Sequence, residues 1–114
     1  MTLGQKQELF AGLMAKLIIR AIAEGYKVRV GEVYRTKYQA REYARLGIGI
    51  INSAHCNKLA VDMFIFMAGK DWQDTETYRE LGEWWEEQHP LCKWGGHFRN
   101  RDGRHFSLEH NGVR

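Results

Sequence analysis

The sequence is poor in cysteine and proline and lacks any long apolar run. Its 114 residues include one proline and two cysteines, Cys56 and Cys92. Two thiols can form at most one bridge, which excludes a disulfide-rich scaffold, and two reduced thiols are expected. No stretch is apolar for long enough to cross a bilayer. The first residues also lack the basic region and apolar run of a signal peptide, so neither a transmembrane segment nor secretion by a signal is expected.

Linkers, low-complexity tracts and internal repeats are also absent. A chain of 114 residues is long enough for one hydrophobic core but too short for a catalytic unit plus a separate binding module. We therefore expect a single domain over residues 1–114. The formal net charge of +3 at pH 7 favours polyanionic partners, which include nucleic acid and equally the anionic bacterial envelope.

Helical periodicity and capping signals predict three helices. Thr2 and Gln5 have the spacing of a capping box, and the apolar residues that follow predict a helix over about residues 4–24. A second capping box, Thr36 with Gln39, opens a shorter helix that Gly47 can close. A third helix is expected over about residues 75–88, because a proline follows at position 90.

Alternating apolar and polar residues predict strands between these helices. One is expected over residues 26–34, with Gly31 as the candidate position of a bulge. A second, over residues 59–66, contains Asp62 and is expected to point it inward. Two short strands should follow, near Lys93 and over residues 105–108. The sequence thus predicts an α+β fold with helices packed on one face of a small antiparallel sheet and a cleft at its open side.

Two short segments, residues 53–62 and 102–106, carry two imidazoles and two carboxylates. Three such groups can close around one metal ion and leave a position open for water, while the remaining carboxylate takes the water's proton. Each pair alone has an ordinary explanation. Asp62 could form a salt bridge with an arginine, and Asp102 with the following glycine favours a hairpin turn. Both segments together predict a zinc hydrolase.

Four motifs occur in order along most of the chain, and together they match the pattern of a known protein family. They are Tyr34-Arg35-Thr36 with Gln39, Ser53-x-His55 with Ala60-Val61-Asp62, Trp94-Gly95-Gly96, and Asp102-x-x-His105-Phe106. The sequence resembles the zinc D-Ala-D-Ala peptidase superfamily and, within it, the phage L-alanyl-D-glutamate endopeptidases that act as endolysins. The resemblance implies a Hedgehog/DD-peptidase-like fold.

The resemblance also implies roles for particular residues. His55, Asp62 and His105 would be the zinc ligands and Asp102 the catalytic base. Arg35 would bind the substrate or polarise its carbonyl, which agrees with the need for positive charge beside a developing oxyanion. Substrate contacts are further expected from Gln39, Ser53 and Trp94.

Several of these residues have competing structural explanations. Arg35 could pair with Glu32 on the surface, Gln39 is explained by its capping box, and Ser53 could be a turn residue. Most tryptophans are expected in the core, with Trp94 as the best candidate for substrate contact.

The sequence departs from the family pattern at three positions. Lys58 stands where a glycine is usual, so a different backbone path and a positive charge near the proposed ion are expected. His97 supplies a spare imidazole that could line the cleft. Glu109 is a rival base, because alternation along a strand from His105 puts both residues on one face.

The function implied by the resemblance is hydrolysis of the L-alanyl-D-glutamate bond in the peptidoglycan stem peptide. A D-Ala-D-Ala carboxypeptidase or dipeptidase, which shares the catalytic residues, and a non-catalytic, zinc-stapled wall-binding module remain alternatives. A metal-dependent nuclease is disfavoured, because such an enzyme needs a helix after the hairpin that carries its histidines. No nucleic-acid partner is therefore expected. The resemblance further implies a monomeric antimicrobial endolysin in bacteriophage host lysis, held in the host cytoplasm until it is released to the periplasm and cell wall.

Overall fold

A 21-residue helix, α1 (Leu3–Ala23), opens the chain in the computed structural model, which describes residues 1–114. The predicted capping box is present: the Thr2 hydroxyl accepts from the Gln5 backbone N–H, and the Gln5 side chain accepts from the Thr2 N–H. The buried positions of α1 recur at helical spacing and are Phe10, Leu13, Leu17 and Ala21. One face of the helix therefore belongs to the core.

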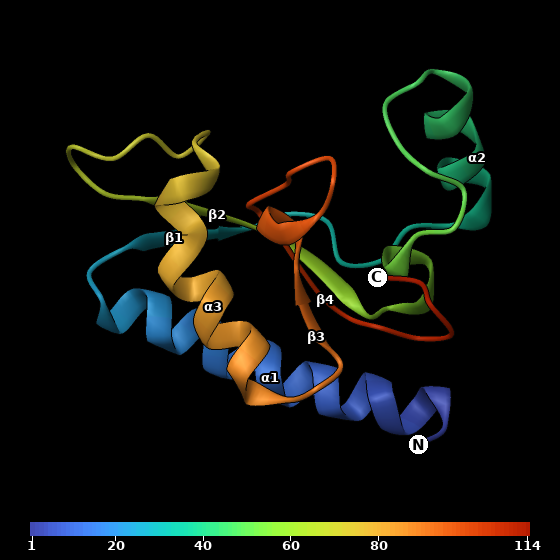
Figure 1. Cartoon of the computed structure of the whole chain (residues 1–114), viewed down its shortest axis with the longest axis horizontal. Coiled ribbons are helices and arrows are strands. Elements are labelled where there is room, and N and C mark those ends of the chain that lie inside the picture. Colours follow the sequence, from blue (N-terminus) through green and yellow to red (C-terminus); the bar gives the residue numbers. More distant parts are fainter.

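Four antiparallel strands form one sheet in the order β1-β2-β4-β3 (Figure 1). The strands are β1 (Lys27–Val30), β2 (Ala60–Phe66), β3 (Cys92–Trp94) and β4 (His105–Leu108). β1 ends earlier than predicted, because the two residues after it both pair with Asp62. The Gly31 N–H donates to the Asp62 carbonyl, and the Asp62 N–H donates to the Glu32 carbonyl. Two residues opposite one is the pattern of a β-bulge, as expected for Gly31.

The hydrophobic core lies on one face of this sheet, beneath α1 and α3 (Arg79–Gln88). From the sheet it takes Val61, Met63 and Ile65 of β2 with Phe106 and Leu108 of β4. α3 follows a 3-10 turn, Thr75–Tyr78, and contributes Trp85, which is fully buried. The predicted α+β architecture, with helices on one face of a small antiparallel sheet, is confirmed.

The remaining helix, α2 (Lys37–Arg45), does not pack on the sheet and projects from the body of the molecule (Figure 1). Thr36 caps it by accepting from the Gln39 N–H, and of its residues only Ala40 is buried. The segment after α2 exposes three isoleucines by 60% or more: Ile48, Ile50 and Ile51. We call residues 37–52 the α2 arm.

Lys58 adopts the left-handed conformation, with φ of 56°, at the end of the 3-10 turn Ala54–Asn57. A glycine would adopt this conformation without strain, whereas the Cβ atom of Lys58 makes it costly. The Lys58 ammonium lies 5.2 Å from the centre of the Tyr34 ring. It does not line the cleft described below, which corrects the expectation of a positive charge near the metal site.

Replacing Lys58 by glycine is expected to raise the free energy of unfolding by roughly 0.5–1 kcal/mol. The free energy gained by relieving the left-handed strain in the folded state should exceed the free energy lost through the greater flexibility of the unfolded chain. Urea unfolding of wild type and variant measures the difference. Lys58→Ala, which keeps the Cβ atom, serves as the control and should not stabilise the protein. A glycine variant less stable than wild type would contradict this account.

Both cysteines are free, as expected from the sequence. Cys92 is buried in the core, and burial raises the pKa of its thiol to about 12. None of the helices combines the length and the apolar character needed to span a membrane.

Candidate metal centre and active-site cleft

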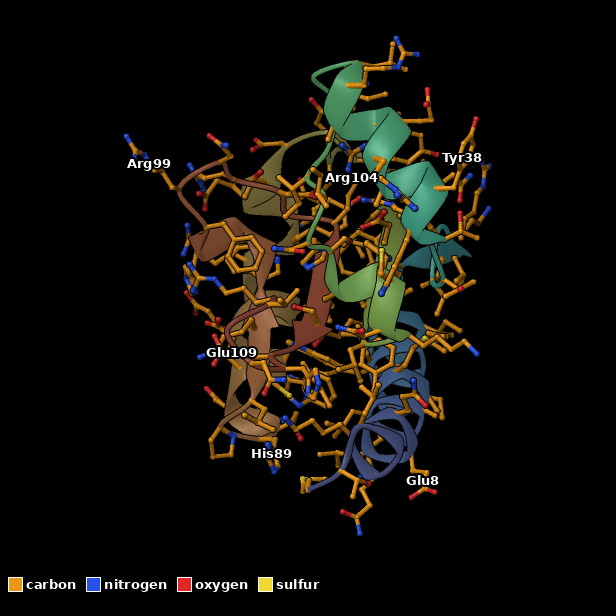
Figure 2. The ribbon with its side chains drawn as sticks, turned by 90° about the vertical axis from the view of Figure 1, so that its right-hand side faces the viewer. Glu8, Tyr38, His89, Arg99, Arg104 and Glu109 are labelled. Carbon is orange, nitrogen blue, oxygen red and sulfur yellow. The ribbon has the colours of Figure 1, made fainter.

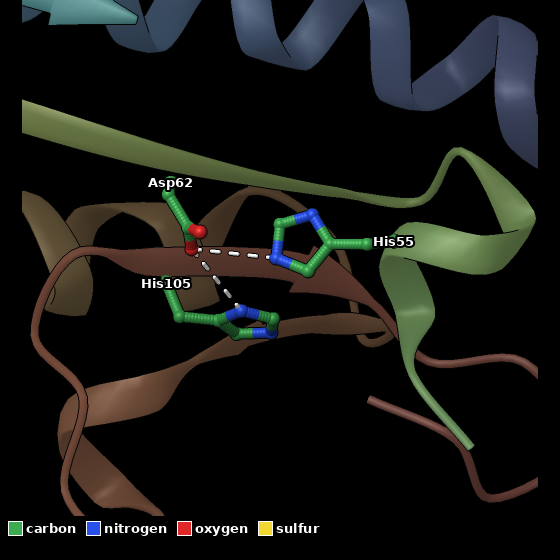
Figure 3. Close-up of side chains that lie close together, drawn as sticks. All are labelled: His55, Asp62 and His105. Atoms are coloured by element: carbon green, nitrogen blue, oxygen red, sulfur yellow. Dashed lines mark ion pairs between the residues drawn. The ribbon is translucent and has the colours of Figure 1, made fainter. Parts of the chain in front are cut away.

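Three side chains that are distant in sequence, His55, Asp62 and His105, converge on one point (Figure 3). The Oδ1 atom of Asp62 lies 3.3 Å from Nε2 of His55 and 3.7 Å from Nδ1 of His105. One potential ligand atom from each residue lies within 4.8 Å of the others. The structure thus brings together the three residues that the sequence motifs single out.

The sheet register explains why two of them meet. Asp62 of β2 and His105 of β4 are direct cross-strand partners and share the face opposite the core. Asp62 is half-buried there, and it points into the cleft rather than inward as predicted, because its neighbours Val61 and Met63 take the core side. His55 reaches the same point from the 3-10 turn that precedes β2.

Hydrogen bonds hold His55 in a defined orientation. Its Nδ1 lies 3.0 Å from the Val33 carbonyl oxygen, which can only accept, so Nδ1 carries the proton and Nε2 faces Asp62. The Ser53 hydroxyl accepts from the His55 backbone N–H at 3.2 Å and fixes the turn. The His105 ring packs against Phe98, with 5.5 Å between ring centres. Its Nε2 atom is buried without a hydrogen-bond partner.

Charges within the cluster oppose the effect of burial. Burial raises the pKa of the Asp62 carboxyl, but hydrogen bonds and charge from His105 and His55 outweigh it and hold that pKa well below its usual range. Burial lowers the pKa of His55, but Asp62 and the Val33 carbonyl outweigh it, so the net pKa is raised. The cluster therefore has a permanent negative charge between two imidazoles, a donor set that suits zinc with one coordination position left open.

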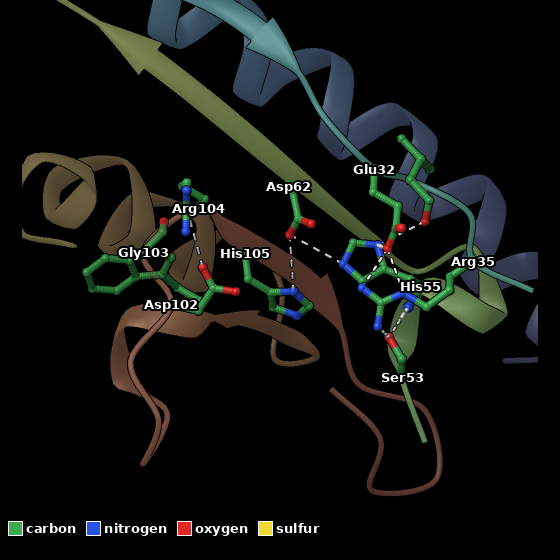
Figure 4. Close-up of polar contacts among 11 residues, drawn as sticks. Glu32, Arg35, Ser53, His55, Asp62, Asp102, Gly103, Arg104 and His105 are labelled. Atoms are coloured by element: carbon green, nitrogen blue, oxygen red, sulfur yellow. Dashed lines mark hydrogen bonds and ion pairs between the residues drawn. The ribbon is translucent and has the colours of Figure 1, made fainter. Parts of the chain in front are cut away.

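On one side of the cluster lies Arg35 (Figure 4). Its Nε and Nη2 atoms contact Oε1 of Glu32 at 2.7 and 2.6 Å, and its Nη1 donates to the Ser53 hydroxyl at 3.4 Å. Arg35 also lines the cleft, so the pairing with Glu32 and a position at the site hold together. Sequence analysis indicates Glu32 only as a surface partner of Arg35. Its position three residues before Arg35 is the pattern that could have indicated an ion pair at the site.

Asp102 lies on the other side of the cluster, in the turn before β4 (Figure 4). Two hydrogen bonds fix this turn: the Asp102 N–H donates to the Gly95 carbonyl at 2.9 Å, and the Trp94 indole N–H donates to the buried Gly103 carbonyl at 2.8 Å. A side chain on Gly95 would collide with the Asp102 carbonyl. The Asp102 carboxylate itself is about half exposed and lines the cleft, as a proton acceptor must.

The prediction that Trp94 contacts the substrate was wrong. Trp94 is fully buried, because it pairs with Phe106 across β3 and β4 and shares its core-facing side. Gln39 is exposed on α2 and does not line the cleft, and its backbone N–H donates to the hydroxyl of the capping residue Thr36. His97 pairs with Glu86 at 2.6 Å outside the cleft.

Glu109, the rival base, also lies outside the cleft. It follows β4, and its backbone N–H donates to the Leu91 carbonyl. Figure 2 shows it well separated from Arg104, the neighbour of Asp102. Of the two carboxylates weighed as the base, only Asp102 lines the cleft that contains the metal cluster.

The cleft that contains these groups has a volume of about 990 Å³. The α2 arm supplies part of its wall through Ile48 and Ile50. Besides Arg35, four arginines line it: Arg99, Arg101, Arg104 and Arg114. None of these four arginines belongs to the sequence motifs. The positive net charge of the chain is the sequence feature that agrees with a basic cleft.

Replacing Trp94 by phenylalanine is expected to slow hydrolysis by roughly ten- to hundredfold, because the turn that carries Asp102 loses an anchor. The buried Gly103 carbonyl left without a donor should cost about 1–3 kcal/mol of stability. Trp85→Phe is the matched control, since the Trp85 indole N–H donates to the Ser107 carbonyl of β4, outside that turn. Urea unfolding should show similar losses of stability in the two variants. Hydrolysis should be slower in Trp94→Phe alone. Equal rates in both variants would argue against the anchor.

The sequence matches no protein-family model, and no curated protein matches it. Among solved structures, the L-Ala D-Glu endopeptidase ChiX of Serratia marcescens superimposes with a TM-score of 0.65 at 25% sequence identity. The match covers 83% of this chain and 77% of that chain. This chain is similar to an endopeptidase. The comparison therefore supports the endopeptidase family indicated by the sequence motifs.

Proposed function

We propose that the protein is a zinc-dependent peptidase that cleaves the peptidoglycan stem peptide between L-alanine and D-glutamate. The observation that carries the proposal is the convergence of His55, Asp62 and His105 beside a cleft-facing Asp102. Similarity to an L-Ala D-Glu endopeptidase supports the choice of bond.

His55, Asp62 and His105 would hold the ion. When bound, zinc supplies a Lewis acid that polarises the scissile carbonyl and makes water more acidic. The carboxylate of Asp102 accepts the proton of the attacking water and passes it to the leaving amine. The Arg35 guanidinium, held by Glu32 and Ser53, presents positive charge to the oxygen on which negative charge develops.

The shape of the cleft favours cleavage inside a peptide over removal of its terminal residue. Arg35 lies on one side of the metal-cluster residues, and Asp102 with Arg104 lies on the other (Figure 4). A substrate can thus extend past the cluster in both directions.

The finer biological role that we propose rests on the motif resemblance. The protein would be a phage endolysin that acts as a monomer, with the host cell wall as its substrate. It would wait in the host cytoplasm until the membrane is opened during lysis. The net charge of +3 suits an anionic wall.

Mass spectrometry of fragments released from purified Gram-negative peptidoglycan tests the proposal. The protein is assayed with zinc and again after a chelator has removed the metal. Chelator-sensitive release of fragments that expose the amine of D-glutamate is the expected result. Loss of terminal D-alanine would identify a carboxypeptidase instead, and no release by the zinc-loaded protein would favour a binding module.

A further inference from the structure

We propose that Arg104 binds the free carboxylate of the D-glutamate residue whose amine leaves during cleavage, and so makes the protein prefer unamidated substrates. The inference rests on the proposed function. D-glutamate has two carboxyl groups, and only one of them continues the peptide. The other is an anion unless it is amidated, so a nearby arginine could distinguish the two forms.

Arg104 is held in place by its surroundings. Its backbone carbonyl accepts from the Met63 N–H of β2 at 2.9 Å. The guanidinium carbon lies 5.5 Å from the centre of the Phe64 ring and 5.8 Å from that of Trp72, and these two rings are themselves 5.8 Å apart. Stacking on aromatic faces orients a guanidinium and leaves its N–H edges free for a carboxylate.

The N–H groups of Arg104 are available. The Nε atom of Arg104 lies 4.0 Å from Oδ1 of Asp102, which is beyond hydrogen-bond length. The Nη atoms of Arg104 have no hydrogen-bond partner. The side chain is 41% exposed and lines the cleft. By contrast, Arg35 is engaged by Glu32, and Arg101 is engaged by Glu76.

The position of Arg104 matches the amine side of the scissile bond. Asp102 must reach the leaving amine to protonate it, so the residue that carries this amine lies on the Asp102 side of the cluster. Arg104 is two residues from Asp102 and lies on that side (Figure 4). Arg114 also stacks on an aromatic ring, Phe98, but forms no ion pair with Asp102.

The experiment compares two synthetic stem peptides, one with D-glutamate and one with D-isoglutamine, at the cleavage position. Zinc-loaded wild type is expected to cleave the D-glutamate peptide with a kcat/KM roughly ten- to hundredfold higher, the scale of one charge-assisted hydrogen bond. Arg104→Gln should lower kcat/KM on this peptide by that factor and leave the rate on the D-isoglutamine peptide nearly unchanged. Arg104→Lys should retain an intermediate preference, because it keeps the charge without the planar fork.

Arg99→Gln is the matched control, because Arg99 lines the same cleft but has no ion pair or aromatic contact. It removes the same charge and should leave the preference intact. Peptides that begin with D-glutamate or D-isoglutamine lack the bond that is cleaved. Their affinities, measured by calorimetry, should follow the same order as the kcat/KM values.

An equal loss on both substrates in Arg104→Gln, or a wild type without preference, would overturn the inference while leaving the proposed function in place. A wild type that cleaves neither peptide would overturn the proposed function, and this inference with it.

Discussion

Replacing Asp102 by asparagine is expected to slow peptide hydrolysis by roughly 10²–10⁴-fold, the contribution of a general base. Asparagine has nearly the same shape, so the turn held by Trp94 and Gly95 should persist. The amide cannot accept the proton of the attacking water. The rate of stem-peptide hydrolysis, the zinc content and the melting temperature are measured for both proteins. The rate should fall, while the zinc content and the melting temperature stay as in wild type.

Glu109→Gln is the control for this prediction, since Glu109 was the other carboxylate considered as the base. It lies outside the cleft and should retain full activity. If Glu109→Gln were the inactive variant and Asp102→Asn the active one, the assignment of the base would be reversed. If neither change affected the function, the zinc would have only a structural role.

Replacing Asp62 by alanine is expected to abolish zinc binding and activity together. The carboxylate lies between two imidazoles and carries the negative charge that draws a cation to the cluster. Free zinc at one hundred times its Kd should stabilise wild type by about 2.7 kcal/mol. A shift of this size raises the melting temperature of a small domain by roughly 10–20 °C, whereas the variant should not respond.

Thermal melts with added zinc and with a chelator measure this difference, together with metal content after dialysis. His97→Ala is the control, because it removes an imidazole that pairs with Glu86 away from the cluster. Its response to zinc should equal that of wild type. A response that survives in Asp62→Ala but disappears in His97→Ala would place the metal elsewhere.

Features that depend on neighbouring residues could be predicted from the sequence. The start of α1 follows from the Thr2 and Gln5 capping box, and the alternation in β2 correctly separates Asp62 from Val61 and Met63. The resemblance carried by the four motifs, rather than local spacing, indicated which two histidines meet Asp62. The other signals lie within one element or within a few residues of each other.

Features that depend on pairing between distant segments could not be predicted. Trp94 belongs to a strand of three residues, and only its pairing with Phe106 decides which face it takes. For the same reason alternation showed two faces of β2 but not which one is covered by helices. The places of Arg99 and Arg104 in the cleft wall depend on loop paths, and arginine is too common on protein surfaces to single out from sequence.

The separation of the α2 arm from the core has a consequence for how the protein can evolve. The groups proposed to hold zinc and move protons come from the sheet and its adjoining turns, whereas Ile48 and Ile50 in the cleft wall come from the arm. Because α2 buries only Ala40, substitutions and changes of length in the arm cost the core little. New substrate preferences can therefore arise in the arm while the catalytic geometry and the folding stability stay as they are.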